Sequence, residues 1–275
     1  MPMTTVFSTI AIVIYLLAAA WLARHLFVLK TKPAEIKLKL IAFASLALFF
    51  HGCVLYQKIL AGAGLELGFY NALSLMSWVI TLMVVVIAMI RPAENLAMVF
   101  LPLTAVCLML ELFFNVRHIV VARTDTLGLK LHILLSIGAY GLLAIAAVQS
   151  LVLALQDYQL RNKRPVQAMR ILPPMQTMEE LLIQLLAIGF FLLTLGLATG
   201  LMFVHNIIEQ HLAHKAVLSI LAWLLFGRVL LGRWFQGWRG RTLITWTLGG
   251  FILLMLAYFG SKMVLELILH RGYTV

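Results

Sequence analysis

The chain has 275 residues, of which 63% are apolar and 11% are charged, and its mean hydropathy is +1.04. Soluble domains are about half apolar and about a quarter charged, so this composition excludes a soluble globular protein and predicts a polytopic membrane protein. The net charge is +11, and the basic residues lie in short loops between apolar runs, as expected when they set the orientation of a membrane protein. The chain has no RNA-recognition motif and no polybasic tail, so no nucleic-acid partner is expected.

The first apolar run, near residues 4–24, is predicted to be a retained membrane span rather than a cleaved signal peptide. No Lys or Arg precedes it, and a basic cluster follows it from Arg24 to Lys39. This charge distribution is the reverse of that in a signal peptide. A helix of about 20 apolar residues crosses a bilayer. By that measure seven further spans follow, near residues 39–60, 70–90, 95–114, 128–156, 178–204, 212–234 and 242–269.

These segments predict an all-α fold, in which eight transmembrane helices form one membrane domain over residues 1–275. Pro102 predicts a kink within the fourth span. The longest loop, near residues 157–177, is too short to be a soluble domain. Cys53 and Cys107 lie inside spans and form no CxxC or CxxCH motif, so they predict packing residues and exclude a redox dithiol and covalent haem attachment.

The loops differ in their content of basic residues, and this difference predicts the orientation. One alternate set of loops holds 13 Lys and Arg, and the other set holds 7, with Arg228 lying inside the seventh span. The richer side is expected to face the cytoplasm, which puts both termini on the outer side. Trp21, Trp234, Trp238 and Trp246 gather at the predicted inner boundary, where an aromatic belt is expected.

Histidines are distributed unevenly between the two sides of the predicted bundle. His51 lies in the outer half of the second span, and only His25 is on the cytoplasmic side. Neutral imidazole binds transition metals and titrates near neutral pH. Each histidine taken alone fits an interfacial residue hydrogen-bonded to backbone, whereas the group as a whole favours a ligand or proton role. Six of the eight fall on the outer side, namely His118, His132, His205, His211, His214 and His270.

Spacing separates two kinds of histidine site. His211 and His214 are three residues apart and share a face if that turn is helical, so together they could clasp a small metal ion. They could not flank a haem, because its axial ligands approach from opposite faces. A bis-histidine haem site needs residues from different helices, and His132 and His270 meet that need at the outer ends of their own spans.

Three segments of the second half carry a family resemblance. They are LKLHILLSIGAYGLLAIAAVQSLVLAL (Leu129–Leu155), GWRGR (Gly237–Arg241) and GFILLMLAYFGSKMVLELILH (Gly250–His270). They resemble the cytochrome c assembly membrane family, in its HemX-type and YpjD-type branch, which is related to the CcsA and CcmC haem-handling proteins. The likeness covers spans five to eight, about residues 128–270, while the first four spans match in hydropathy.

The resemblance implies a haem-handling role at the outer face, with haem held between two histidines that flank a tryptophan-rich segment. His132 falls on the first of these histidines and His270 on the second, so this pair is the implied set of axial ligands to haem iron. HKAVLSILAW (His214–Trp223) falls on the end of the tryptophan-rich segment. There Lys215 matches, but Ala213 replaces the aspartate of the relatives.

Further positions are secondary candidates for the same cofactor. An intramembrane histidine of the relatives falls at Leu231 here, and His51 is our conjectured substitute for it. His205 and His214 are the other secondary candidates. Porphyrin carboxylates seek basic side chains, so Arg123, Lys130 and Lys215 could meet haem propionates.

Other charged residues have structural interpretations that we prefer. Glu111 is predicted to pair with Arg117 or to face an aqueous cavity. Lys262 and Glu266 are four residues apart and predict an ion pair on one helix face, with a propionate anchor as the functional alternative. The GWRG loop predicts basic anchors for anionic lipid headgroups.

The sequence therefore predicts a multi-pass protein of the bacterial inner membrane that binds or handles haem in cytochrome c biogenesis or haem homeostasis. No catalytic nucleophile or acid–base pair stands out, so an enzyme is not expected. One alternative is a membrane adaptor that regulates another membrane protein and has lost haem binding. The other is a small-molecule or metal transporter, which would need ionisable residues at mid-membrane and interrupted helices.

Overall fold

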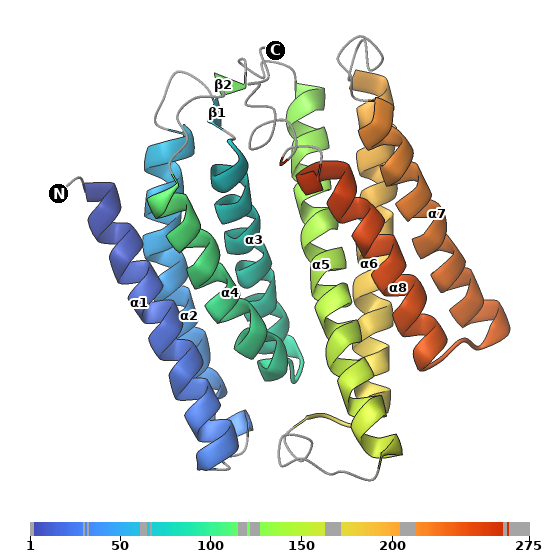
Figure 1. Cartoon of the computed structure of the whole chain (residues 1–275), viewed down its shortest axis with the longest axis horizontal. Helices are drawn as coiled ribbons and strands as arrows, with labels where there is room; N and C mark the ends of the chain where they lie inside the picture. Colours follow the sequence, from blue (N-terminus) through green and yellow to red (C-terminus); the bar gives the residue numbers. More distant parts are fainter. Residues whose placement is uncertain are drawn as a thin grey trace. The chain divides into compact units, whose positions relative to one another are not determined.

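The computed structural model describes residues 3–29, 31, 33–60, 65–66, 68–114, 120–121, 127–162, 172–203, 213–260 and 263. The chain divides into two compact units. Unit 1 comprises Met1–Arg123, Val166–Leu172 and Gly272–Val275, and unit 2 comprises Thr124–Pro165 and Pro173–Arg271. Each unit contains four long helices (Figure 1).

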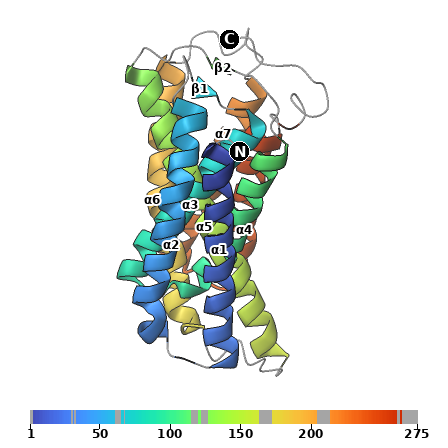
Figure 2. The same cartoon turned by 90° about the vertical axis from the view of Figure 1, so that its left-hand side faces the viewer.

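In unit 1 the helices form a bundle in which neighbours along the chain are neighbours in space. Its elements are α1 (Met3–Ala23), η1 (Arg24–Val28), α2 (Pro33–Leu55), η2 (Tyr56–Leu60), α3 (Phe69–Ile90) and α4 (Glu94–Phe113). Helix α1 packs against α2 and α4, as Figure 2 shows, and α3 packs against the same two helices. Two short strands, β1 (Leu65–Glu66) and β2 (Val120–Val121), pair in antiparallel orientation. The long elements are all helices, as the all-α prediction expected, and this short strand pair is an addition to it.

Small residues let the helices of unit 1 approach closely. Ala11 and Ala18 of α1 and Ala44 and Ala47 of α2 are at most 2% exposed. Lipid tails are as apolar as leucine side chains, so membrane helices associate through close packing and interhelical hydrogen bonds rather than through the hydrophobic effect. Buried alanines on both helices are consistent with this kind of close packing.

In unit 2 four helices again pack in chain order around a common core. Its elements are α5 (Leu127–Arg161), α6 (Met175–Phe203), α7 (Ala213–Gln236), α8 (Arg241–Met255) and η4 (Leu256–Gly260). Helix α5 packs against α6 and α8, and α7 packs against the same two helices. Glycine allows two of these crossings, because a Cβ at Gly189 would lie 2.9 Å from the Leu143 side chain and one at Gly250 would lie 2.8 Å from the Phe226 ring.

The prediction of eight spans is confirmed within the described residues, where eight helices are long and apolar enough to cross a membrane. Their edges differ from the predicted ones. Helix α5 continues to Arg161 rather than stopping near residue 156, because Asp157 pairs with Arg161 one turn later. Helix α4 runs through Pro102 without ending. The predicted eighth span extends beyond Gly260 into residues that lie outside the described part of the chain, and the predicted orientation stays a prediction.

Candidate functional site

His132 lies in the second turn of α5, and its ring is fixed by α6. The Nδ1 atom lies 2.8 Å from the Gly196 carbonyl oxygen and 3.4 Å from Thr199 Oγ1. A carbonyl oxygen only accepts, so Nδ1 carries the proton and donates it to Gly196. In the neutral imidazole the lone pair is then on Nε2, and no described residue hydrogen-bonds to that atom. This is the arrangement in which histidine binds a metal through one nitrogen while the other holds the ring in place.

The sequence of α6 creates this seat for the imidazole. A Cβ at Gly200 would lie 2.8 Å from His132 Cε1, so only glycine lets α6 approach the ring at that position. Thr199 Oγ1 bonds back to the carbonyl oxygens of Leu195 and Gly196 at 2.8 and 3.0 Å. Backbone and side-chain oxygens of one helical turn thus surround Nδ1, while the ring stays only partly buried.

His51 lies in a different setting, in the buried interior of unit 1. It is 0% exposed, as are its partners Tyr15 and Ser74. Its Nε2 atom lies 2.9 Å from Ser74 Oγ, and its Nδ1 atom lies 3.4 Å from the Tyr15 hydroxyl. Both ring nitrogens are therefore engaged by hydroxyl groups. His51 stays a conjectured ligand, and it would have to give up one hydroxyl partner to bind iron.

A stripe of hydroxyl side chains continues from Ser74 along α3. Ser77 Oγ donates to the Ser74 carbonyl oxygen at 2.8 Å, and Thr81 lies 2.6 Å from Thr104 of α4, measured between Oγ1 atoms. These residues and Tyr15 are not among the residues predicted from the sequence. The spacing of Ser74, Ser77 and Thr81 could have predicted a polar face on this helix, because residues three and four apart lie on one side of a helix.

Glu111 has a partner that is not predicted from the sequence. Its carboxylate pairs with Lys58 of η2. Arg117 lies outside the described residues, so its predicted pairing with Glu111 stays a prediction. The Glu111 side chain is 2% exposed, and its second oxygen, Oε2, has no hydrogen-bond partner within the described part of the chain. The sequence does not reveal this contact, because the two partners are 53 positions apart in the chain.

The other predicted ligands do not form a described cluster. His214 is exposed in the first turn of α7. His205 and His270 lie outside the described residues, so the pairing of His132 with His270 stays a prediction. Among the described residues, no three His, Cys, Asp or Glu side chains converge as a metal site. His51 belongs to unit 1, whereas His132 and His214 belong to unit 2.

Trp223 matches the tryptophan-rich segment of the relatives, and in this chain it is a packing residue. Its Nε1 donates to Thr194 Oγ1 at 2.8 Å. Its ring stacks on Phe190 with centroids 5.6 Å apart and planes 17° apart. Trp223 is thus committed to the contact between α6 and α7.

Comparison with known proteins identifies the family. The sequence model of the family described as "Cytochrome C assembly protein" matches residues 39–269. "Inner membrane protein YpjD" of Escherichia coli (strain K12) is 34% identical over 268 residues, which cover 96% of this chain and 99% of that protein. The "Uncharacterized 28.8 kDa protein in nifR3-like 5'region" of Azospirillum brasilense is 37% identical over 143 residues, which cover 51% of this chain and 53% of that protein.

No solved structure matches the chain. The family match extends beyond spans five to eight, which alone carried the residue-level resemblance, into the second, third and fourth spans. The YpjD relative aligns over nearly the whole length of both chains. On these grounds the chain belongs to the cytochrome c assembly protein family.

Proposed function

We propose that the protein is a haem-binding protein of the bacterial inner membrane that acts in cytochrome c biogenesis or haem homeostasis. Family membership, the eight membrane-spanning helices and the inner-membrane name of the YpjD relative support this proposal. The single observation that carries it is the hydrogen bond from His132 Nδ1 to the Gly196 carbonyl oxygen, because it leaves Nε2 ready to bind a metal.

The residues present fit haem at one axial position. His132 is oriented by a carbonyl oxygen, the residue is only partly buried, and no described residue hydrogen-bonds to Nε2. His270, which matches the second histidine of the family resemblance, is the proposed second ligand, with His51, His205 and His214 as secondary candidates. Bound haem would supply a redox-active iron. The role of the chain is to hold and orient it, and we propose binding rather than catalysis.

A haem titration tests the proposal. The purified full chain in detergent should develop a Soret band that saturates with added haem, and His132→Ala should lose most of that binding. His25→Ala is the matched control, because His25 Nδ1 also bonds to a carbonyl oxygen, that of Trp21 at 3.0 Å, on the predicted cytoplasmic side. No saturable Soret band, or equal binding by wild type and His132→Ala, would overturn the proposal.

A second function is favoured by the state of the tryptophan-rich segment. Ala213 stands where the relatives have an aspartate, and Trp223 is occupied by Phe190 and Thr194 rather than open to a porphyrin plane. These features fit an adaptor that keeps the fold and regulates another membrane protein. A haem-free preparation that retains one partner at fixed stoichiometry, and that binds no added haem, would favour the adaptor.

A further inference from the structure

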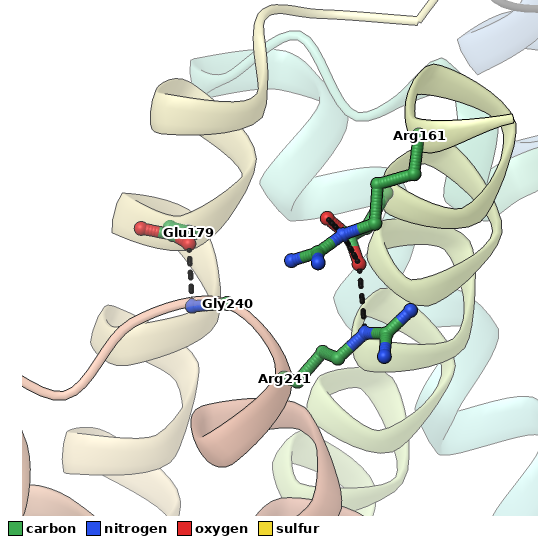
Figure 3. Close-up of polar contacts among 5 residues, drawn as sticks. Arg161, Glu179, Gly240 and Arg241 are labelled. Carbon is green, nitrogen blue, oxygen red and sulfur yellow. Dashed lines mark hydrogen bonds and ion pairs between the residues drawn. The ribbon is translucent and has the colours of Figure 1, made fainter. Parts of the chain in front are cut away.

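A cluster of arginines lies at the end of unit 2 where α5 ends, α6 begins and α7 turns into α8. We name the side chains of Arg161, Arg239 and Arg241 the arginine cluster. Arg161 Nε donates to both oxygens of Asp157 at 2.9 and 3.0 Å, and Arg241 Nε donates to Asp157 Oδ2 at 3.2 Å. Figure 3 shows Arg161 and Arg241 reaching toward each other from α5 and from the start of α8.

The third arginine is held in the same manner by a buried carboxylate of α6. Arg239 Nε donates to Glu179 Oε2 at 3.3 Å. The Gly240 backbone N–H donates to Glu179 Oε1 at 2.9 Å, as Figure 3 shows. The Glu179 side chain is 7% exposed, whereas that of Arg239 is 57% exposed. The carboxylates are thus inside the bundle and the guanidinium groups outside it.

The pairing leaves most of the guanidinium donors unused. A guanidinium has five N–H donors. Asp157 and Glu179 take only the Nε–H of each arginine, so the terminal amino groups have no hydrogen-bond partner within the described part of the chain. Three cations against two carboxylates also leave a net positive charge. Asp157 and Glu179 therefore hold the arginine cluster in position without cancelling its positive charge. The cluster can thus bind a further anion.

The backbone of the connecting turn keeps the cluster in place. Gly237 and Gly240 have φ values of +65° and +57°, which only glycine adopts without strain, and they bracket Trp238 and Arg239. Arg233 Nη1 donates to the Trp238 carbonyl oxygen at 3.2 Å, and the Arg228 guanidinium lies 4.1 Å from the centre of the Trp238 ring. These two arginines brace the turn rather than join the cluster.

The surroundings specify an amphiphilic anion. Trp234 and Phe235 in the last turn of α7 are 63% and 81% exposed, and Trp246 of α8 is 37% exposed. Tryptophan side chains favour the depth of lipid headgroups. Each of these rings lies within five residues of Arg239 or Arg241 in the chain, so a phospholipid bound at the arginine cluster would have its acyl chains available to them. Basic pockets between membrane helices bind anionic headgroups in this manner.

We infer that the arginine cluster binds the phosphate of an anionic phospholipid. Guanidinium suits this task because its planar fork matches phosphate oxygens, and its terminal amino groups are available here. The site is distinct from the proposed haem site and does not depend on it, since it is built from the opposite end of α5. A lipid held there would bridge α5, the turn between α7 and α8, and the start of α8.

Competitive lipid binding to the full chain tests the inference. Delipidated protein in detergent is offered phosphatidylglycerol and phosphatidylcholine, and native mass spectrometry measures which lipid is retained. Phosphatidylglycerol should be preferred, because the choline cation of phosphatidylcholine offsets the charge of its phosphate. Arg161→Gln, Arg239→Gln and Arg241→Gln should each weaken phosphatidylglycerol binding about five-fold and phosphatidylcholine binding less. Equal retention of the two lipids by wild type would overturn the inference.

Two controls separate a built site from general attraction by positive charge. Arg91→Gln removes an exposed arginine of unit 1 that makes no ion pair among the described residues, so it should leave the preference intact. Asp157→Asn makes the chain more positive, so general attraction predicts tighter binding, whereas a positioned site predicts weaker binding. An equal loss in Arg91→Gln, or a gain in correctly folded Asp157→Asn, would overturn the inference.

The source of the phosphate is tested by competition. Inorganic phosphate should fail to displace phosphatidylglycerol at equal concentration, because it lacks the acyl chains that contact the exposed aromatic rings. Displacement at equal concentration would show an anion site without lipid character and would overturn the assignment to a phospholipid. Because haem binding is not measured in any arm, these results are independent of the test of the proposed function.

Discussion

The contact between His132 and Gly196 is the residue-scale basis of the haem proposal. His132 could be identified as a candidate in the sequence because imidazole binds metals and because this residue lies near the start of a span. Its partner could not be identified in the same way, because the accepting group is a backbone carbonyl 64 residues away. Any residue at position 196 has a carbonyl group, so no side chain marks the contact.

Gly200 gives a way to move the imidazole without removing it. In Gly200→Ala the new Cβ would lie 2.8 Å from His132 Cε1, so the ring must shift away from the Gly196 carbonyl oxygen. Loss of such an orienting bond lowers metal affinity by about 10- to 100-fold. A haem titration should show this loss in Gly200→Ala and none in Gly249→Ala, where a Cβ meets nothing within 4 Å. Unchanged affinity in Gly200→Ala would count against the role of the Gly196 bond.

His51 is a residue whose burial predicts a stability effect. In His51→Ala, the hydroxyls of Tyr15 and Ser74 lose their partner in an interior that is 0% exposed. A buried polar group left unsatisfied costs about 1–3 kcal/mol. The melting temperature in detergent should fall in His51→Ala relative to wild type and relative to His25→Ala. If the two variants melt alike, the hydroxyl contacts contribute no measurable stability.

At the scale of elements, the spans could be predicted because a membrane helix needs a long apolar run. Their ends could not, because polar residues extend a helix once they find tertiary partners. Asp157 and Arg161 prolong α5 by pairing with each other, and Arg241 adds a partner from α8. The ion pair between Lys58 and Glu111 in unit 1 could not be predicted either, because it joins α4 to η2, which follows α2.

The turn between α7 and α8 carries an element-scale prediction. Gly240 has φ +57° and ψ −128°, a conformation open to glycine alone, and its N–H donates to Glu179. Gly240→Ala should therefore destabilise unit 2 by about 1–3 kcal/mol, the cost of a strained backbone position. Thermal unfolding would measure it against Gly249→Ala, which lies in the middle of α8 with free space around it. Equal stability of the two variants would contradict the strain argument.

At the scale of the whole molecule, hydropathy and family resemblance predicted the class of the protein, and the family match and the eight helices confirm it. The division into two four-helix units had no signal in composition, because all spans are alike in hydropathy. The single membrane domain over residues 1–275 stays a prediction, as does the placement of both termini on the outer side.

Orientation can be measured by labelling with an impermeant maleimide. The native Cys53 and Cys107 are first replaced by alanine, and single cysteines are then introduced at two exposed positions, Arg91→Cys and Leu127→Cys. In intact cells Leu127→Cys, at the first residue of α5, should react, and Arg91→Cys should react only after lysis, because basic loops stay on the cytoplasmic side. The reverse pattern would place His132 on the cytoplasmic side and contradict haem binding at the outer face.

The central claim is that two imidazoles from separate helices, His132 and His270, hold one haem iron. Electron paramagnetic resonance of the haem-loaded ferric protein tests it most directly, because two axial imidazoles give a low-spin signal and one gives a high-spin signal. The account predicts a low-spin signal for wild type and for His25→Ala, and its loss in His132→Ala and in His270→Ala. A low-spin signal that survives both of these replacements would contradict the account.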